Sequence, residues 1–510
     1  MLTKESLPKR YLFVDLDGTL INTDLIFETF FSLFKKNILA PIFCFSKFLI
    51  GGIPSLKKFL FENSVISVAN LPYNQDVLEY INSWKEKYQG EVILISASDH
   101  RLVQKVADYL GIFDAAHGTI DINLKSDNKL KKILEISGTH AFDYMGNSRD
   151  DLVIFKLSRK SFLVNPTLFL RKKAKNLSHS ITLIENKRKL FFSFIRLIRL
   201  HQWVKNLLLF TPMILGKLYG LDQFPDLVLA FISFSLMASS FYVFNDLLDI
   251  ESDRQHASKK FRPFAAGEIS IQSGIIIFPL LIFSSIVLAW NLSFNFQIIL
   301  ILYAISTLMY SQYFKGVPIL DIFLLSYLYV LRIIAGVLII DANISSWLIT
   351  FSVFFFLFLA SIKRYIEISK SSDKSLSSRG YVSNDKNFIF QLSSFAGLIS
   401  VLVICLYIDS QQALEIYSSI YALWFIPFIL MYWIVNILFN AHRGSVDDDP
   451  VVYVITDKKS YICLIIFLMV LFFAAQIPAF NTLNIFSKGI PFMSKKTSDH
   501  RHQNSNRMCN

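Results

Sequence analysis

The sequence predicts two parts of different fold class: an N-terminal α/β domain and, after it, an all-α polytopic membrane domain with about nine transmembrane helices. In the first part, short apolar strands that end in polar residues alternate with helical stretches, the pattern of a parallel sheet with a site along one edge. In the second part, apolar segments long enough to cross a bilayer follow one another. A hydrophobic content of 53% over 510 residues and a mean hydropathy of +0.45 suit a membrane protein that also has a soluble domain.

The strands of the N-terminal domain each end in a polar motif. The first lies within YLFVDLDGTL, residues 11–20, and ends in Asp15 and Asp17; the second, Val92–Ile95, ends in Ser96-Ala-Ser98-Asp99; the third ends in YMGNSRDD, residues 144–151. Helices are expected between them at Asn74–Tyr88 and Asp127–Glu135. Because the carboxyl ends of parallel strands lie at one edge of a sheet, these polar residues should share one site.

These motifs, in this order, resemble those of the haloacid dehalogenase (HAD) superfamily of phosphohydrolases over about residues 8–168. The resemblance implies a HAD-like (Rossmannoid) fold with a helical cap at about residues 21–90. It implies that Asp15 is the nucleophile, that Asp17 protonates the leaving group, that Ser96 holds a phosphate oxygen and that Lys129 neutralises the phosphate. It also implies Mg²⁺ bound by Asp15, Asp17, Asn147 and Asp151. Paired aspartates with Mg²⁺ and a lysine can form and then hydrolyse an aspartyl phosphate.

Asn147 departs from the superfamily pattern GDxxxD, because it stands where the first aspartate is expected. The change removes one negative charge from the metal site. Two interpretations follow: an active phosphatase with weaker metal binding, or a domain kept mainly as a scaffold. We favour the active phosphatase.

The predicted cap contains an unusually apolar segment, ILAPIFCFSKFLIGGI, residues 38–53. It is too short and too interrupted for a transmembrane span. It is either the buried core of the cap or a face that lies on the membrane, where it would help a phosphatase reach a lipid substrate.

Composition divides the chain into four segments. These are the α/β domain at residues 1–175, a basic linker at 176–200, the membrane domain at 201–480 and a polar tail at 481–510 that is expected to be disordered. The net charge of +12 lies mainly beside apolar segments, which favours contact with anionic lipid over nucleic acid. The four cysteines lie far apart, so neither a zinc site nor a disulfide framework is expected.

The membrane domain is expected to cross the bilayer nine times, at about residues 204–219, 227–245, 273–291, 295–313, 318–340, 345–362, 387–408, 416–439 and 460–480. The connections after spans one, three, five and seven contain no Lys or Arg, whereas the alternate connections are basic. By the positive-inside rule, this pattern predicts a multi-pass membrane protein with the N-terminal domain in the cytoplasm and the C-terminus outside.

An acidic cluster follows the second span: Asn245, Asp246, Asp249 and Asp253. If the helix continues, the three aspartates lie on one face, because positions three and four apart are neighbours. Oxygen ligands of this kind suit Mg²⁺ and a diphosphate bridged to it. The basic residues behind the cluster, Lys259, Lys260 and Arg262, can bind phosphate oxygens.

The motif NDxxDxxxD, the nine spans and the long loop after span two resemble the UbiA superfamily of intramembrane prenyltransferases. A second acidic motif, found after span six in most of that superfamily, is replaced here by the basic stretch SIKRYIE, residues 361–367. One acidic cluster opposed by Lys and Arg suits a soluble diphosphate donor and a lipid acceptor that carries a monophosphate.

Four further segments, RLHQWVKN, NDLLDIESDRQHASKKFRPFAAG, YSQYFK and GSVDDDPVV, resemble the decaprenyl-phosphate phosphoribosyltransferases within that superfamily. This resemblance, which is to bacterial enzymes, implies a location in a bacterial inner (cytoplasmic) membrane. It also implies transfer of 5-phosphoribose from phosphoribosyl diphosphate (PRPP) to a polyprenyl phosphate. It implies that Asn245 and the three aspartates bind Mg²⁺ and the PRPP diphosphate, while Lys259, Lys260 and Arg262 contact donor phosphates. Residues placed around the acceptor phosphate or ribose are Lys205, Tyr310, Lys315 and Arg332. The HAD-like domain would then remove the 5-phosphate from the lipid-linked product.

Two other functions stay open. An aromatic prenyltransferase that makes a quinone precursor from a prenyl diphosphate would need the second acidic motif. A non-catalytic membrane scaffold or transporter would explain buried carboxylates, but these lie at the ends of spans, and no inverted repeat is evident. For Arg332, the alternative to a ligand is a side chain that extends to the membrane interface.

Overall fold

A computed structural model of the chain describes residues 10–138, 142–175, 181–185, 190–215, 221–256, 258–342, 345–370, 380–446, 453 and 457–476. The tail at 481–510 and the acidic run Asp447–Asp449 lie outside these residues. The chain forms two compact units, residues 1–345 with 371–383 and residues 346–370 with 384–510. The first unit contains the N-terminal domain together with the first membrane helices.

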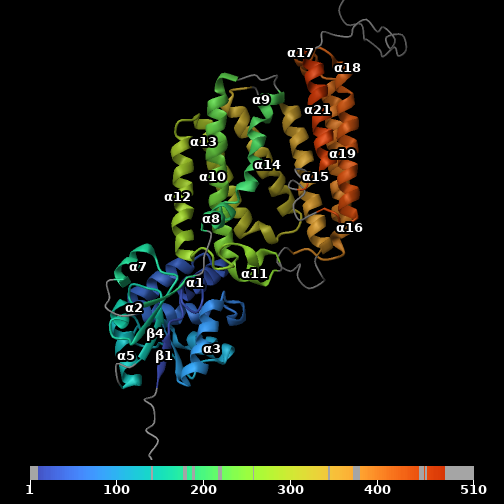
Figure 1. The fold of residues 1–510 in the computed structure, drawn as a ribbon. Helices are drawn as coiled ribbons and strands as arrows, with labels where there is room; N and C mark the ends of the chain where they lie inside the picture. Colours follow the sequence, from blue (N-terminus) through green and yellow to red (C-terminus); the bar gives the residue numbers. More distant parts are fainter. Residues whose placement is uncertain are drawn as a thin grey trace, which may run out of the picture. The chain divides into compact units, whose positions relative to one another are not determined.

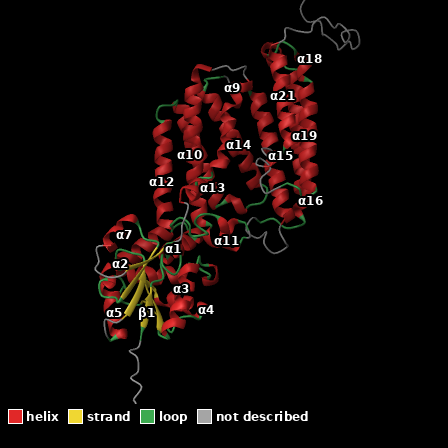
Figure 2. Cartoon of the chain, viewed as in Figure 1, coloured by secondary structure: helices red, strands yellow, loops and turns green. Residues whose placement is uncertain are grey.

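The N-terminal domain is built on a parallel sheet of six strands in the order β3-β2-β1-β4-β5-β6 (Figures 1 and 2). The strands are β1 Tyr11–Val14, β2 Glu91–Asp99, β3 Ala115–Thr119, β4 Phe142–Gly146, β5 Lys160–Val164 and β6 Ile181–Ile184. Since β1 pairs with both β2 and β4, the three polar motifs predicted from the sequence lie at adjacent strand ends. The predicted α/β fold class is confirmed.

Both faces of the sheet are buried at the central strand β1, which explains why this strand is continuously apolar. Along β1, Leu12 and Val14 belong to one hydrophobic cluster and Phe13 belongs to another, as expected when successive side chains point to opposite faces. Helices α3 Gln75–Tyr88, α4 His100–Leu110, α5 Asp127–Ser137, α6 Leu152–Phe155 and α7 Leu168–Lys175 connect the strands. The helices expected at 74–88 and 127–135 are confirmed by α3 and α5.

The predicted cap is helical and consists of α1 Leu25–Lys36, α2 Ala40–Asn63 and the 3₁₀ helix η1 Val68–Asn70. Helix α2 is kinked at Gly51–Gly52, where Gly52 has a φ of 65° that favours glycine. Large apolar side chains before the kink are exposed: Ile38, Leu39, Ile42, Phe43, Phe45, Phe48, Leu49 and Ile50. Segment 38–53 is therefore not a buried cap core, and that interpretation is wrong. The alternative, a face that lies on the membrane, stays a prediction.

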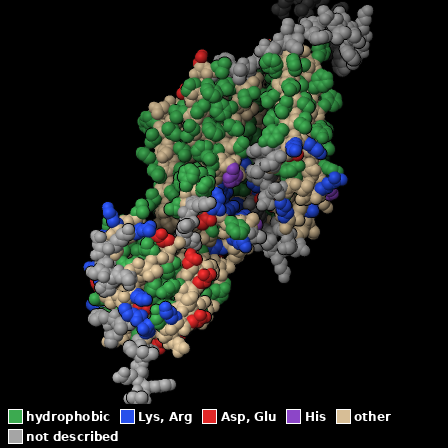
Figure 3. Space-filling view, in the orientation of Figure 1, with side chains coloured by type: hydrophobic (Ala, Val, Ile, Leu, Met, Phe, Trp, Pro, Cys, Tyr) green, Lys and Arg blue, Asp and Glu red, His purple; other side chains and the backbone are tan. Residues whose placement is uncertain are grey.

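Eight helices of the described residues are long and apolar enough to cross a membrane. They are α10 Phe224–Leu248 with the preceding η3 Leu221–Gln223, α12 Ile271–Ala289, α13 Phe294–Gln312, α14 Leu320–Ile339, α15 Ser346–Lys370, α16 Asp385–Ile408, α19 Phe425–His442 with the preceding α18 Ile420–Leu423, and α21 Lys458–Gln476. Figure 3 shows hydrophobic side chains covering the outer faces of α10, α12 and α13. The predicted all-α membrane domain is confirmed.

The first predicted span, 204–219, differs from the other eight. Its described part is a 3₁₀ helix, η2 Leu200–Phe210, continued by the short α9 Thr211–Leu215. Pro212 lies near the start of α9, where its missing N–H costs no hydrogen bond. Because a 3₁₀ helix rises by about 2.0 Å per residue, η2 and α9 together extend ~30 Å, about the thickness of the hydrocarbon core. This segment can therefore reach across a bilayer without being a long α-helix.

Helix α1 of the cap also packs against the membrane part of the same unit. Its Phe31 shares a hydrophobic cluster with Val243 and Leu247 of α10 and with Phe264. In the same contact, Arg254 donates two hydrogen bonds to the Glu28 carboxylate at 2.6 and 2.7 Å, and both side chains are less than 5% exposed. Asp24, before α1, accepts a hydrogen bond at 3.1 Å from Gln272 of α12. The cap is thus part of two cores.

Replacing Glu28 with alanine should loosen this contact. The substitution leaves the Arg254 guanidinium buried without its carboxylate, which costs about 3–5 kcal/mol for a buried ion pair. Hydrogen exchange in detergent micelles should show a loss of protection in α1 of that size. The control is Glu135→Ala, which removes an exposed ion pair between Glu135 and Lys132. It should change the free energy of hydrogen-exchange protection by less than ~1 kcal/mol. Equal protection in Glu28→Ala and the wild-type protein would contradict this account.

Candidate active sites

The first candidate site lies where β1, β2 and β4 end. The Asp15 carboxylate, directly after β1, accepts a hydrogen bond at 2.7 Å from the Lys129 ammonium of α5. Asp17 accepts hydrogen bonds from the hydroxyls of Ser96 at 2.8 Å and Ser98 at 2.7 Å. The sheet therefore brings together the four side chains that the sequence predicted as catalytic in this domain.

Asp151 lies in the same pocket and is held firmly. One carboxylate oxygen accepts hydrogen bonds from the backbone N–H groups of Asn147 and Ser148 at 3.2 and 2.9 Å and from the Ser148 hydroxyl. The other accepts the Tyr144 hydroxyl at 2.7 Å and lies 3.6 Å from the Lys129 ammonium. Tyr144 was not predicted, because a tyrosine in a buried strand reads as core.

The charges of this pocket explain its titration. Burial raises the pKa of Asp15 to about 7; Lys129 opposes the rise, while Asp151 and Asp17 add to it. Burial would lower the pKa of Lys129, but Asp15 and Asp151 raise it above its usual value, so the ammonium stays charged at neutral pH. One ammonium thus faces three carboxylates, and the pocket has a surplus of negative charge that a cation can neutralise.

Asn147 has the position and the free acceptor expected of a cation ligand. Among the described residues, its buried side-chain oxygen has no hydrogen-bond partner. Its amide nitrogen lies against Gly18, where a Cβ added to the glycine would come within 2.0 Å of it, and the Gly18 φ of 73° also favours glycine. The glycine of the DxDGT motif thus leaves the room that the Asn147 side chain occupies. Oxygen donors and surplus negative charge fit Mg²⁺.

The cap adds a lysine that the sequence did not reveal. Lys57 of α2 donates a hydrogen bond at 2.8 Å to the Asn123 side chain and another to the Ala97 carbonyl. Burial lowers the pKa of Lys57, while the charges of Asp17 and Asp24 raise it. A hollow of about 10 Å³ is lined by Lys57, Ser98 and parts of α1 and α2. Lys57 thus brings the cap to the end of β2.

The second candidate site lies at the end of α10. Asn245 and Asp246 are in its last turn, Asp249 follows its end, and Asp253 is in the short α11 Ile250–Gln255. The helix does not continue through Asp249, which has φ −100° and ψ 8°. The expectation that Asp246, Asp249 and Asp253 lie on one face of a continuous helix is therefore wrong. The break turns Asp249 toward different partners.

Four cations surround these carboxylates. Arg262 contacts Asp246 at 3.1 Å and Asp253 at 2.7 Å. Arg199 also contacts Asp246. Asp249 accepts hydrogen bonds from Lys35 at 2.6 Å and from Lys315 at 3.1 Å. Arg262 and Lys315 were predicted, whereas Arg199, the first residue of the motif RLHQWVKN, and Lys35 of the cap were not.

The cations control the charge of the cluster. Burial raises the pKa of Asp249, but the ammonium groups of Lys315 and Lys35 lower it to about 2. Burial raises the pKa of Asp253 to about 6; the negative charge of Asp246 also raises this pKa, whereas the positive charge of Arg262 lowers it. Burial lowers the pKa of Arg262, and the carboxylates of Asp246 and Asp253 raise it above its usual value. At neutral pH, Asp249 and Arg262 are thus charged and Asp253 is mostly so.

The other predicted residues of the membrane domain differ in how deeply they are buried. Asn245, Tyr310 and Lys259 are half-buried, and Lys260 is exposed. Lys205 and Arg332 are buried inside the helices, at 8% and 5% exposure. Arg332 therefore does not extend to the membrane interface, and that alternative is wrong.

The hydrogen bonds of Arg332 point into the bundle. Its guanidinium donates to Asn206 at 2.8 Å, to the Tyr303 hydroxyl at 3.1 Å and to the Leu328 carbonyl. The Asn206 amide in turn donates to Ser235 at 2.8 Å. This polar network joins η2, α10, α13 and α14, so Arg332 is held by neighbours other than the acidic cluster.

In the described part of the chain, no three His, Cys, Asp or Glu side chains form a metal centre by themselves. In the membrane cluster, the carboxylates are paired with Lys and Arg instead. The donor set is nevertheless all oxygen, and it lies beside cations that can turn to phosphate, which fits a complex of Mg²⁺ with a diphosphate.

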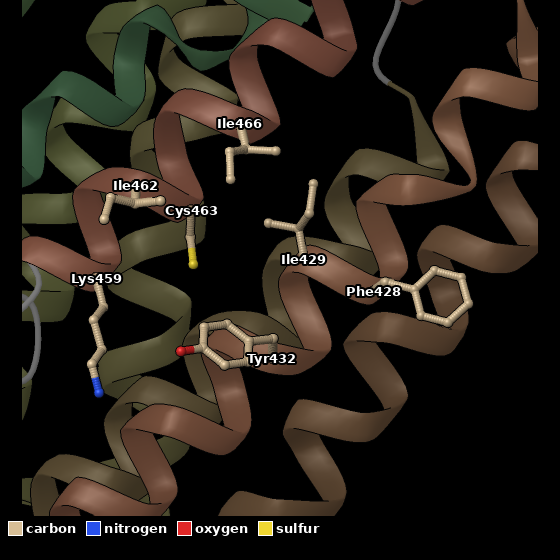
Figure 4. Close-up of a pocket in the computed structure, with 7 residues that line it drawn as sticks. All are labelled: Phe428, Ile429, Tyr432, Lys459, Ile462, Cys463 and Ile466. Atoms are coloured by element: carbon tan, nitrogen blue, oxygen red, sulfur yellow. The ribbon is translucent and has the colours of Figure 1, made fainter.

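The second unit contains an apolar hollow of about 330 Å³ between α19 and α21. Figure 4 shows Tyr432, Cys463 and Lys459 among its lining residues. It contains none of the predicted site residues. The basic stretch SIKRYIE also lies in this unit, where Arg364 is buried and paired with Glu367.

Comparison with known proteins agrees with the motifs. A model of the UbiA prenyltransferase family matches residues 208–448. The decaprenyl-phosphate phosphoribosyltransferase of Mycolicibacterium smegmatis is 32% identical over 268 residues, 48% of this chain and 80% of that protein. The chain belongs to the UbiA prenyltransferase family. It is thus a multi-pass membrane protein of a transferase family, as predicted.

Two further relatives show how far the similarity extends in this UbiA-family chain. The nodulation protein NoeC of Azorhizobium caulinodans is 32% identical over 54% of this chain and 91% of that protein. The uncharacterized protein y4nM of Sinorhizobium fredii is 31% identical over 462 residues, 88% of each chain. A match of that length is longer than the membrane part, so it extends into the N-terminal domain.

Proposed function

We propose that the membrane domain transfers 5-phosphoribose from PRPP to a polyprenyl phosphate at the cytoplasmic face of a bacterial inner membrane, and that the N-terminal domain then removes the 5-phosphate. The observation that carries the proposal is the acidic cluster with its four surrounding cations. The phosphoribosyltransferase relatives support the donor. The N-terminus is proposed to be cytoplasmic and the C-terminus outside.

In the transferase site, Asp246, Asp249 and Asp253 with Asn245 would hold Mg²⁺, which neutralises the diphosphate as it leaves. Lys259, Lys260 and Arg262 would bind donor phosphates. The bond from the anomeric carbon to the diphosphate breaks, and an oxygen of the acceptor phosphate bonds to that carbon. The positive charge that develops on the ribose is stabilised by nearby carboxylates. The acceptor is already an anion, so no strong base is needed.

The acceptor side of this site is proposed to include Lys205, Tyr310 and Lys315. Arg332 is better explained as a residue that positions η2 and α14, because its hydrogen bonds are taken up by Asn206, Tyr303 and Leu328. Burying a guanidinium in a membrane protein is costly unless such partners are present.

In the N-terminal site, Asp15 would attack the phosphorus of the 5-phosphate, and Asp17 would protonate the ribose oxygen that leaves. Water then hydrolyses the aspartyl phosphate, which releases phosphate and restores Asp15. Ser96 and Lys129 would hold the phosphate oxygens. Asp15, Asp17, Asn147 and Asp151 would hold Mg²⁺, whose charge would offset that of the phosphate.

Purified protein in nanodiscs with a short polyprenyl phosphate tests both steps. PRPP labelled in the ribose should label the lipid, and PRPP labelled at the 5-phosphate should give a lipid that loses its label as free phosphate. If PRPP is not consumed, while a prenyl diphosphate and an aromatic acid are, the chain is an aromatic prenyltransferase. A lipid product that keeps its 5-phosphate indefinitely would rule out the phosphatase step.

Replacing Asn147 with aspartate should strengthen Mg²⁺ binding in the N-terminal site. The added charge occupies a position where the wild-type oxygen is buried and has no hydrogen-bond partner among the described residues. We expect the Mg²⁺ concentration for half-maximal hydrolysis of p-nitrophenyl phosphate to fall about fivefold or more, since a nearby opposite charge contributes at least ~1 kcal/mol. The same change at the exposed Asn128 is the control. Equal Mg²⁺ dependence of both variants would contradict the assignment.

A further inference from the structure

Lys35 belongs to the N-terminal domain by sequence but to the membrane site by contact. It lies in the last turn of α1, the first helix of the cap. Its ammonium group donates to an Asp249 oxygen at 2.6 Å and to the Ser252 hydroxyl at 3.3 Å. The side chain is 46% exposed, so a soluble ligand can reach it.

Lys35 is held at this place by the rest of its helix face. Glu28, Phe31 and Lys35 are three and then four residues apart, so they form one stripe along α1. Glu28 makes the buried ion pair with Arg254, and Phe31 packs among residues of α10 and its following loop. The lysine therefore approaches Asp249 from a helix anchored at two earlier points.

The surroundings of Lys35 suit an anion. The two oxygens of Asp249 each face an ammonium group, one from Lys35 and one from Lys315. Arg199 and Arg262 bring the nearby cations to four, against the three carboxylates of Asp246, Asp249 and Asp253. A carboxylate that has two lysines can keep one when the other turns to a phosphate oxygen.

We propose that the N-terminal domain completes the transferase site, with Lys35 as a cation that binds the diphosphate of the soluble donor. This assignment rests on the proposed transferase function. It means that the cap of one enzyme domain supplies a substrate-binding residue to the other. The N-terminal domain would then be required for transfer as well as for the later hydrolysis.

The test compares Lys35→Met with Lys36→Met in the full-length protein. Lys36 is the neighbouring residue, it is exposed, and it leaves the Asp249 contact intact. Loss of one charged hydrogen bond should raise the KM for PRPP roughly 10- to 100-fold in Lys35→Met, with a smaller change in kcat. Lys35→Arg should recover most of the loss, and Lys36→Met should behave as wild type.

A second measurement separates this assignment from the proposed function. This measurement is the binding of inorganic diphosphate in the presence of Mg²⁺, determined by titration calorimetry on proteins that all carry Asp15→Asn. The affinity for diphosphate should fall by a similar factor when Lys35→Met is added. If the wild-type protein does not consume PRPP but this weakening is seen, the donor is wrong and the Lys35 site stands. Equal KM and equal diphosphate binding in the Lys35→Met and Lys36→Met proteins would overturn the assignment.

A purely structural role of Lys35 has a different signature. In that case Lys35→Met would lower the hydrogen-exchange protection of α1 as Glu28→Ala does. Such a loss would also overturn the assignment. We expect protection of α1 and hydrolysis of p-nitrophenyl phosphate to stay at the wild-type level.

Discussion

Replacing Asp15 with asparagine should abolish phosphate-monoester hydrolysis, with kcat reduced by at least about 10⁴-fold, as for other enzymes that lose their nucleophile. An amide cannot attack phosphorus, and it also lacks the negative charge that faces the Lys129 ammonium in the wild-type protein. The measurement is hydrolysis of p-nitrophenyl phosphate, together with release of phosphate from the lipid-linked product.

The matched control for this variant is Asp150→Asn. Asp150 is close in sequence to Asp151, but its carboxylate is half-exposed and pairs with Lys125 at 3.0 Å on the surface. This variant should keep its activity within a factor of about two. Transfer from PRPP should continue in Asp15→Asn, so that the 5-phosphorylated lipid accumulates. Hydrolysis at the wild-type rate in Asp15→Asn would exclude Asp15 as the nucleophile.

Replacing Asp246 with alanine should reduce transfer from PRPP by at least about 10³-fold, the loss expected when a preorganised charged group is removed from an active site. Asp246 is 2% exposed and is contacted by both Arg199 and Arg262, so its loss leaves two guanidinium groups without a shared partner. Single-turnover transfer of labelled ribose to polyprenyl phosphate is the measurement.

Asp226→Ala is the control for Asp246→Ala, because it lies in the first turn of the same helix, α10, and is exposed. It should transfer at close to the wild-type rate. Hydrolysis of p-nitrophenyl phosphate should be unchanged in both variants. If the protein is a non-catalytic scaffold or transporter, the rate of transfer should not differ between Asp246→Ala and Asp226→Ala.

Much of the fold was predictable because it depends on local pattern. The strands β1, β2 and β4 are apolar runs with polar ends, and the sheet order places those ends side by side. The membrane helices follow from long apolar segments. Asp15, Asp17 and Ser96 were predicted to lie together and do so, because the positions of strand ends in a parallel sheet are fixed by the fold. Lys129 lies on helix α5 and was predicted from the resemblance to the superfamily; it also reaches this site.

What could not be predicted depends on contacts between distant residues. The break at Asp249 has no glycine or proline to mark it, and the sequence around it reads as one amphipathic helix. Lys35 and Lys57 are ordinary lysines on cap helices, and only the packing of α1 and α2 gives them partners in the two sites. From the sequence, Tyr144 is expected to be a core residue of a buried strand, and only the structure shows that its hydroxyl donates a hydrogen bond to Asp151.

Helix α1 has one further consequence. The backbone N–H of its first residue, Leu25, donates to Asp17 at 2.9 Å, while Lys35 near its other end contacts Asp249. Its 12 residues extend ~18 Å, which is shorter than the ~30 Å thickness of the bilayer core. The contacts of α1 with the two candidate sites are therefore about one helix length apart. In the proposed sequence of reactions, this is the separation that the lipid product of the first site would have to cover to reach the second.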